Sequence, residues 1–286
     1  MPNLKEIRAR ISSVGSTMQI TSAMKMVSAA KLKRAQDSII QLRPYSNKLT
    51  ELLNNLSSSL DATIGGDLTS DRGEKNVLII AITSNRGLCG AFNTNIIKKV
   101  KNISENKYSK SKISLLTIGK KGSEFFARNN YNVISSHDEL YDELTFENSS
   151  KIAQSIINSF LNKKFDKVIL VYNQFKNAAT QIIVSEQFLP IKPQQTTNAI
   201  KNYIFEPNQE EIVSELIPKS LKSQFFKGIL DSYASEHGAR MTAMHKATDN
   251  AGELKRELTL TYNKARQAAI TGEILEIVGG AEALQS

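Results

Sequence analysis

The stretch AQDSIIQLRPYSNKLTELLNNLSSSL, residues 35–60, places apolar or small side chains at alternating steps of four and three residues. The positions that follow this rule are Ala35, Ile39, Leu42, Ser46, Leu49, Leu53, Leu56 and Leu60. Such a repeat is the seam of a left-handed coiled coil. Similar spacing continues upstream, so we expect one helix from Leu4 to about Leu60. It should bend at Pro44, which removes a backbone hydrogen bond.

The end of the chain carries a second long helical pattern, from about Asn208 to Leu284. Its contact positions again recur at three and four residues, and many are small: Met241, Met244, Thr248, Ala251, Leu254, Leu258, Thr261, Ala265, Ala268, Gly272 and Leu275. At 1.5 Å per residue the two helices would reach about 85 Å and about 115 Å. A small domain cannot cover helices of that length. We therefore expect them to pair with each other, antiparallel, with another protein covering the overhang.

The middle of the chain has a different pattern, in which short β-branched runs alternate with helical segments. The predicted strands are Val77–Thr83, Ile113–Ile118, Tyr131–Ser135, Val168–Tyr172 and Gln181–Ser185, with helices at Phe92–Ile103 and Ser149–Leu161 and an added edge strand at Tyr203–Phe205. This alternation predicts an α/β domain around a mostly parallel sheet. The predicted fold is a long antiparallel coiled coil of N- and C-terminal helices, residues 1–60 and 208–286, plus a small central Rossmann-like α/β domain, residues 76–206.

Charge and composition limit the possible partners and the compartment. The 286 residues carry a net charge of +9, and residues 1–50 contain nine Lys and Arg against two acidic residues, a local charge of +7. Nucleic acid, an anionic membrane surface or an acidic protein ring would each match this field. The longest purely apolar run has six residues, Val77–Ile82, so no membrane insertion is expected. Charged residues interrupt the N-terminus, which argues against a secretory signal, and the single Cys89 suits a reducing cytoplasm.

One glycine-rich turn is a candidate for phosphate binding. The run AITSNRGLCGAF, residues 81–92, lies between a predicted strand and a predicted helix. It lacks both the dinucleotide and the P-loop glycine spacing, so a structural turn is favoured over a nucleotide site. The glycines and lysines of residues 119–122 likewise predict a solvated turn.

Other catalytic or metal-binding patterns are weak. His237 and His245 stand eight residues apart without a third ligand at a recognisable spacing, so we expect solvated surface positions. Cys89 has no histidine near it in sequence, which favours a small core or turn thiol over a nucleophile. The sequence predicts no catalytic site, no cofactor and no metal.

Four segments resemble ATP synthase gamma subunits. They are ITSAMKMVSAAKL at residues 20–32, SNRGLCGAFN at 84–93, VYNQFKNAATQ at 171–181, and the C-terminal run at 235–281, which ends in ITGEILEIVGGA. Their order matches the family, and the resemblance covers nearly the whole chain. Asn85 stands where the family usually has an acid, which puts an ionic role of that turn in doubt. The regulatory dithiol insertion of chloroplast forms is absent.

The resemblance implies a non-catalytic rotor shaft that couples proton flow to ATP synthesis and hydrolysis. Its implied partners are a ring of alpha and beta subunits around the shaft, the epsilon subunit and the membrane c-ring, at the cytoplasmic face of the inner (plasma) membrane. By position, the residues that face beta subunits or tie the two helices together are Met24, Lys25, Arg266, Gln267, Thr271, Glu273 and Glu276. Tyr203 matches the foot that meets the membrane ring.

Two other classes stay open from the residues alone. A basic coiled-coil protein that binds nucleic acid would explain the charge of +9, and its affinity would fall steeply with salt. A small α/β enzyme acting on phosphate compounds would need to bind nucleotide as an isolated chain.

Overall fold

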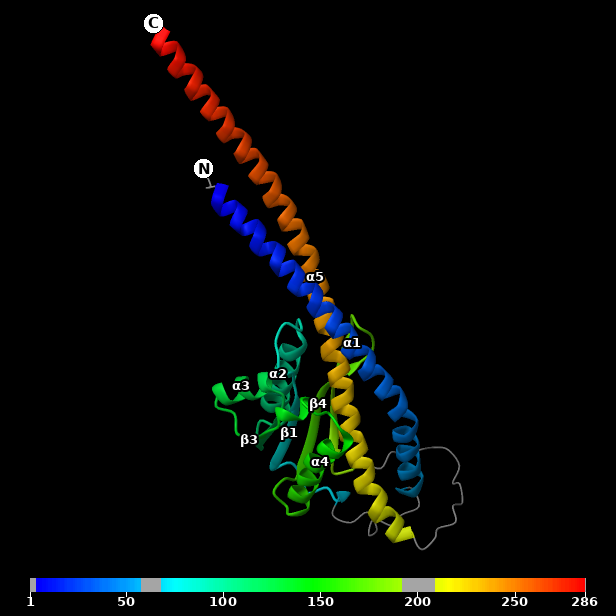
Figure 1. Cartoon of the computed structure of the whole chain (residues 1–286). Coiled ribbons are helices and arrows are strands. Elements are labelled where there is room, and N and C mark those ends of the chain that lie inside the picture. Colours follow the sequence, from blue (N-terminus) through cyan, green and yellow to red (C-terminus); the bar gives the residue numbers. More distant parts are fainter. Residues whose placement is uncertain (1–3, 58–67, 192–208, 286) are drawn as a thin grey trace. The chain divides into compact units, whose positions relative to one another are not determined.

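The computed structural model describes residues 4–57, 68–191 and 209–285. Contacts divide the chain into two compact units, residues 1–28 with 241–286, and residues 29–240. Two long helices, α1 (Leu4–Ser57) and α5 (Gln209–Gln285), contribute to both units (Figure 1). Both helices were predicted within a few residues, and both continue through an internal proline, Pro44 and Pro218.

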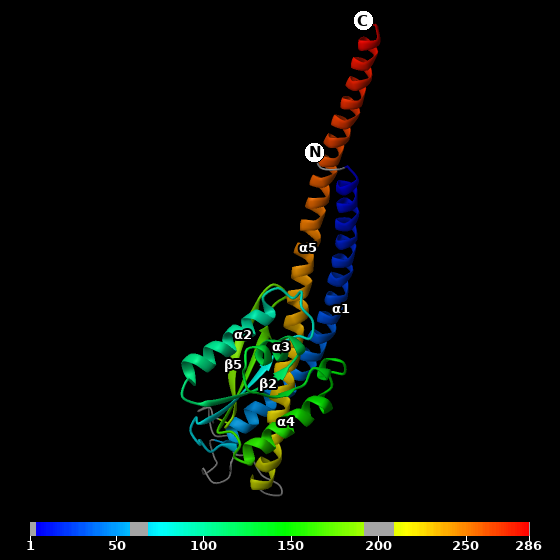
Figure 2. The same ribbon diagram turned by 90° about the vertical axis from the view of Figure 1, so that its left-hand side faces the viewer.

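In the first unit, α1 and α5 lie side by side and run in opposite directions (Figures 1 and 2). As the residue number rises along α1 from Gly15 to Lys25, the neighbour in α5 falls from Lys255 to His245. Between these contacts the Thr21 and Thr248 hydroxyl oxygens are 2.8 Å apart. The predicted antiparallel pairing of the terminal helices is therefore confirmed.

The end of α5 extends beyond the described part of α1. Continuing the same register places Leu4, the first described residue, near Arg266. From residue 266 to residue 281 every position is exposed except Ala269 and Gly272, which are half-buried. This last part of α5 has no helix of the described chain beside it.

The second unit contains a five-stranded sheet in the order β3-β2-β1-β4-β5. The strands are β1 (Asn76–Ile82), β2 (Lys112–Ile118), β3 (Val133–Ser136), β4 (Lys167–Phe175) and β5 (Gln181–Leu189). The first four strands in this order are parallel, and only the β4–β5 pair is antiparallel. The mostly parallel sheet is as predicted.

Helices cover both faces of the sheet because successive strand residues point to opposite sides. On one face, Leu78, Ile80 and Ile82 of β1 join a core with α4 (Phe146–Leu161) and residues 217–229 of α5. On the other face, Val77, Ile79 and Ala81 pack with α2 (Phe92–Asn102), a π-helical turn (Ile103–Lys107) and Phe126 of α3 (Lys120–Arg128). The sheet is thus the middle layer of an α/β/α unit.

α5 lies unusually close to the sheet at Gly228. A Cβ atom there would come within 2.9 Å of the Leu170 side chain on β4. Small residues thus allow this helix to cross the sheet face. The predicted seam of α1 is buried in the same unit at Ala35, Ile39, Ser46 and Leu49.

Two sequence expectations differ from the structure or lie outside its described part. Gly119 and Gly122 were predicted in a solvated turn; this was wrong, since both are buried at the start of α3. The glycines are needed there because a Cβ at Gly119 would lie 2.1 Å from the Thr83 carbonyl oxygen and one at Gly122 would lie 2.6 Å from the Thr83 hydroxyl oxygen. The predicted strand at residues 203–205 lies outside the described residues. Within the ranges described above, no helix is long and apolar enough to span a bilayer.

Candidate functional site

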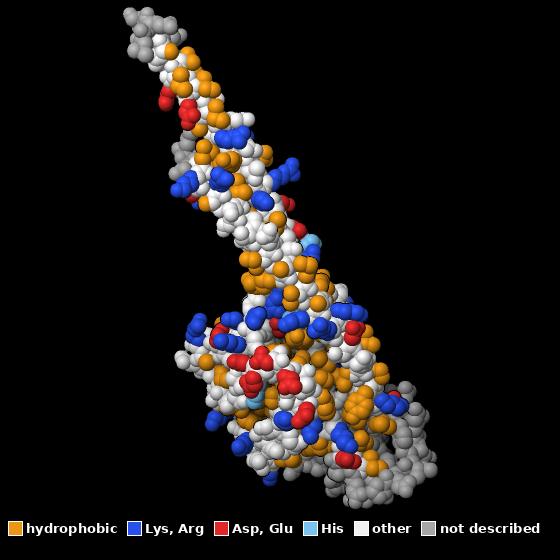
Figure 3. Space-filling view, viewed as in Figure 1, with side chains coloured by type: hydrophobic (Ala, Val, Ile, Leu, Met, Phe, Trp, Pro, Cys, Tyr) orange, Lys and Arg blue, Asp and Glu red, His pale blue; other side chains and the backbone are white. Residues whose placement is uncertain are grey.

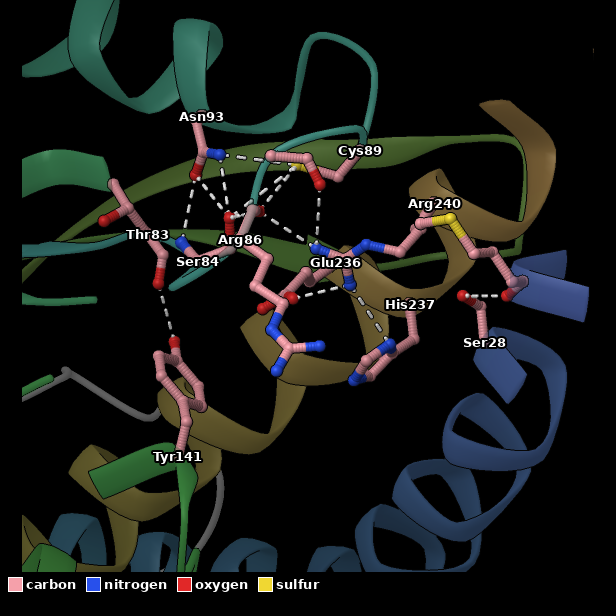
Figure 4. Close-up of polar contacts among 12 residues, drawn as sticks. Ser28, Thr83, Ser84, Arg86, Cys89, Asn93, Tyr141, Glu236, His237 and Arg240 are labelled. Carbon is pink, nitrogen blue, oxygen red and sulfur yellow. Dashed lines mark hydrogen bonds and ion pairs between the residues drawn. The ribbon is translucent and has the colours of Figure 1, made fainter. Parts of the chain in front are cut away.

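The glycine-rich turn after β1 is held by a network of its own side chains (Figure 4). The Ser84 amide donates to Asn93 Oδ1 at 3.0 Å, and the Ser84 hydroxyl donates to the Arg86 carbonyl at 2.7 Å. Asn93 Nδ2 in turn donates to Ser84 Oγ at 2.8 Å and to Cys89 Sγ at 3.3 Å. Leu88 and Gly90 have φ values of 62° and 60°, so the backbone turns sharply here. The turn is closed by internal bonds.

Arg240 of α5 lies beneath this turn, and its guanidinium group binds carbonyl oxygens of the turn. Its Nη1 donates to Glu236 Oε1 at 2.7 Å, and its Nη2 donates to the carbonyls of Arg86 and Gly87 at 3.0 and 3.3 Å. Both side chains of the ion pair are only 8% exposed. Because carbonyl oxygens of the turn face a buried guanidinium, this part of the turn is arranged to accept from a cation and does not present amides to a phosphate. The geometry supports a structural turn, as predicted.

His237 is buried beside the ion pair, so its predicted surface position was wrong. Its Nδ1 lies 3.3 Å from Arg240 Nη1, and its ring packs edge-on against Tyr233 at 4.5 Å between centroids. Because arginine can only donate, Nδ1 must accept and carries no proton. Burial, with Arg240 and Lys31 nearby, lowers the pKa of His237 to about 3. A neutral imidazole at this position is compatible with the adjacent cation, whereas a second positive charge would not be.

Burial also alters the acid–base properties of the groups around Arg240. It raises the pKa of Glu236 despite the neighbouring Arg240. It likewise raises the pKa of the Cys89 thiol, which is 2% exposed, so the thiol is a poor nucleophile. Tyr141 donates its hydroxyl to the Thr83 carbonyl at 2.9 Å and stacks on Tyr233. These contacts hold together three parts of the chain at the end of the sheet where the parallel strands finish: the end of β1, the segment after β3, and α5.

Asn85 has a defined role that does not need charge. Its Oδ1 accepts from the Lys120 amide at 3.0 Å, and its Nδ2 donates to the Asp138 carbonyl at 2.8 Å. An aspartate could make the first bond but not the second. The ionic role that was in doubt from the sequence is therefore replaced by an amide bridge between the turn and two neighbouring loops.

The predicted shaft residues lie in two separate places. Met24 and Lys25 are half-buried on α1, with Lys25 Nζ 3.3 Å from His245 Nδ1. The others are all exposed on the last part of α5: Arg266, Gln267, Thr271, Glu273 and Glu276. Tyr203 lies outside the described residues, so its predicted contact stays a prediction. His245 is exposed, as predicted.

Sequence reasoning missed the pair of Glu236 and Arg240. A signal was present, because the pair is spaced i, i+4 on a helix and is flanked by the small residues Ala234, Ser235 and Gly238, which allow close packing. Gly238 indeed lies against Ala178, with 3.2 Å to a Cβ added there. Among the described residues, no group of three or more His, Cys, Asp or Glu could hold a metal ion.

Comparisons with known proteins agree over the full length. The family model described as ATP synthase matches residues 3–284. The chain is 62% identical over 286 residues to the ATP synthase gamma chain of Flavobacterium johnsoniae, covering 99% of both chains, and 52% identical over 296 residues to that of Cytophaga hutchinsonii, covering all of both.

Solved structures give the same fold. The central stalk and c-ring structure of the Tetrahymena thermophila mitochondrial ATP synthase contains a chain with 27% identity and a TM-score of 0.59, covering 80% of this chain and 99% of that one. A chain of the Euglena gracilis mitochondrial ATP synthase has a TM-score of 0.70 at 19% identity, covering 98% and 94%, which supports the fold alone. These findings favour the rotor interpretation over a nucleic-acid binder or a phosphate enzyme. The chain belongs to the ATP synthase gamma chain family, whose members are the non-catalytic subunit that forms the central rotor stalk of the F1Fo ATP synthase.

Proposed function

We propose that this chain transmits torque between a proton-driven membrane ring and a catalytic ring of alternating alpha and beta subunits. The observation that carries the proposal is the last part of α5, which extends past its partner helix with apolar side chains in the open. Ile270, Ile274, Leu275, Ile277 and Val278 are between 47% and 71% exposed. Figure 3 shows hydrophobic side chains along this end of the chain.

These exposed apolar residues need a covering protein. Contiguous apolar surface on a helix marks a contact with another protein, and a surrounding ring would enclose the helix on all sides. From residue 266 to residue 281 the helix is exposed on all sides apart from Ala269 and Gly272, which fits such a ring better than a single partner helix, which would cover one stripe. We assign the alpha and beta subunits to this role.

The shaft residues would bias the catalytic ring through differences between their faces. Arg266, Glu273 and Glu276 put charge on one side of α5, whereas Gln267 and Thr271 put neutral polar groups on another, by the 3.6-residue repeat. Each beta subunit would then meet a different surface as the shaft turns. Contacts that differ in this way shift the conformational equilibrium of each subunit and hence its nucleotide affinity.

Met24 and Lys25 would act where the two helices are still paired. Met24 is a flexible side chain that adapts to a changing neighbour, and Lys25 lies 3.3 Å from His245 across the pair. Both residues would contact beta subunits and would also stabilise the pairing of α1 with α5.

The sheet-containing unit would attach to the membrane ring. We place the epsilon subunit and the c-ring against the unit of residues 29–240, with Tyr203 at the ring, and the whole assembly at the cytoplasmic face of the membrane. The relatives' structures pair such a stalk with a c-ring.

The test combines assembly and coupling. The chain is coexpressed with its own alpha, beta and epsilon subunits, and the purified complex should contain alpha and beta in threefold excess. Removal of residues 268–286 should abolish ATP-driven proton pumping by inverted membrane vesicles, whereas Lys98→Gln, a change at an exposed position on α2, should leave pumping intact. Pumping at the normal rate by the truncated chain, or purification without alpha and beta, would contradict the proposal.

A further inference from the structure

Six lysines gather in the unit of residues 29–240 at the end of the sheet where its inner parallel strands begin. All six are exposed, and they come from the segments that lead into three neighbouring strands, β2, β1 and β4: Lys75, Lys107, Lys110, Lys112, Lys163 and Lys164. We call this set the lysine edge. In Figure 3, Lys and Arg side chains lie along the lower margin of the sheet-containing unit, apart from the acidic cluster higher on the same face.

Hydrogen bonds fix these segments next to one another. The Lys112 amide donates to the Lys75 carbonyl at 2.7 Å, and the Asp166 amide donates to the Asn76 carbonyl at 2.8 Å. Tyr108 lies among them, with the amines of Lys107 and Lys167 at 5.4 and 5.6 Å from its ring centre. Because adjacent strands are about 4.8 Å apart, the positive charges are spread over a strip about 10 Å wide.

Four acidic residues lie in the same segments and offset only part of the lysine charge. Glu74 binds Lys167 at 2.5 Å, and Glu105 is 3.7 Å from Lys101. Asp166 accepts from the Asn76 amide at 2.8 Å, and Asp71 accepts from the Gly73 amide at 2.9 Å. Residues 71–76, 105–112 and 163–167 together contain eight Lys and Arg against four acidic residues, so a net charge of +4 is left for an external anion.

The lysine edge lies at the end of the sheet opposite Arg240. Arg240 binds the turn that follows β1, whereas Lys75 precedes β1, so the seven-residue strand separates them by about 20 Å. Arg240 is also the last residue of this unit before α5 continues into the helix pair. If the unit of residues 29–240 attaches to the membrane ring, as proposed above, the lysine edge can meet the lipid around that ring.

From this placement we infer that the lysine edge binds the anionic headgroups of phospholipids at the membrane surface. Clusters of four to eight lysines or arginines bind anionic lipid without insertion. Nucleic acid fits less well, since the aromatic side chains of these segments are not free to stack on bases: Tyr108 is only 2% exposed, and Phe165 is half-buried against the core. The contact would steady the unit of residues 29–240 against the bilayer around the c-ring.

The experiment measures cosedimentation of the full-length chain with vesicles. Vesicles of phosphatidylcholine alone are compared with vesicles that also contain phosphatidylglycerol, at low and at physiological salt. The unaltered chain should bind only the anionic vesicles, and more weakly as salt screens the charges. The rim variant carries Lys→Gln at all six positions of the lysine edge. The matched control carries Lys→Gln at six exposed lysines elsewhere: Lys33, Lys98, Lys151, Lys176, Lys246 and Lys264.

Each lysine near an anionic surface contributes about fivefold to binding, so the rim variant should lose at least about 100-fold. The control should bind within a few-fold of the unaltered chain. Equal losses in the two variants would overturn the inference, as would tighter binding of the lysine edge to RNA than to vesicles. Thermal unfolding of both variants checks that they fold. Copurification of the rim variant with alpha and beta subunits separates this inference from the proposed function, since assembly should not depend on the lysine edge.

Discussion

Replacement of Arg240 by alanine is the perturbation that tests the junction between α5 and the turn after β1. The change removes the 2.7 Å ion pair with Glu236 and the two bonds to the Arg86 and Gly87 carbonyls. At an effective dielectric constant of about 20, charges 2.7 Å apart attract by about 6 kcal/mol. The free-energy cost of removing both charged groups from water offsets part of this attraction. Leaving one member of such a buried pair alone costs about 3–5 kcal/mol in the free energy of unfolding.

The loss should depend on pH in a defined direction. Without Arg240, burial would raise the pKa of Glu236 further above its ordinary value of about 4.3. Below that value the carboxyl is protonated in both the folded and the unfolded state, so the deficit should shrink. As the pH rises toward neutrality, the deficit should grow to its full size.

Urea unfolding followed by circular dichroism at acid and neutral pH measures this. Arg256→Ala, an exposed arginine on the same helix, serves as the control and should change stability by less than about 0.5 kcal/mol. The double variant Glu236→Gln with Arg240→Met should recover much of the loss at neutral pH, because no buried charge remains. Arg240→Ala with a loss below about 1 kcal/mol at every pH would refute the reasoning.

Three further predictions concern the same unit. Burial raises the pKa of Asp231 to about 6 from 3.8, so protonation of Asp231 stabilises the folded state at low pH. This contribution to the free energy of unfolding, up to about 3 kcal/mol, is lost as the pH rises through about 6. Asp231→Asn should therefore flatten the pH dependence of the free energy of unfolding measured from about pH 4 to 8. Gly119→Ala should lower the melting temperature by several degrees, because φ is 99° and the new Cβ would meet the Thr83 carbonyl, whereas Gly87→Ala, with nothing within 4 Å, should not. The buried Cys89 thiol should react with a thiol reagent at least about tenfold faster in urea than in the folded chain, as followed by absorbance; equal rates would contradict its burial.

The sequence predicted the repeating elements well because their side-chain periods are regular. The four-and-three spacing from Ala35 to Leu49 marked a helix that is indeed buried on that stripe. The β-branched run at residues 77–83 marked a strand covered on both faces, which needs no alternation.

The site around Arg240 could not be predicted in the same way. Residues 228–240 of α5 are all buried except Tyr233 and Ala239, which are half-buried, so a polar residue there has no exposed side of the helix to occupy. His237 was predicted to be exposed, as its residue type favours, and Arg240 was missed. Their burial depends on contacts with the turn at Arg86 and Gly87, about 150 residues away in sequence, which local patterns do not contain.

The unpaired end of α5 has a consequence for assembly. A lone helix of about 20 residues that includes Gly272, Gly279 and Gly280 is marginally stable in water. In the free chain its amide protons should exchange with solvent rapidly and a protease should trim it first. Enclosure by neighbouring subunits would then supply the order that the segment lacks alone, so protection of its amides would report completed assembly.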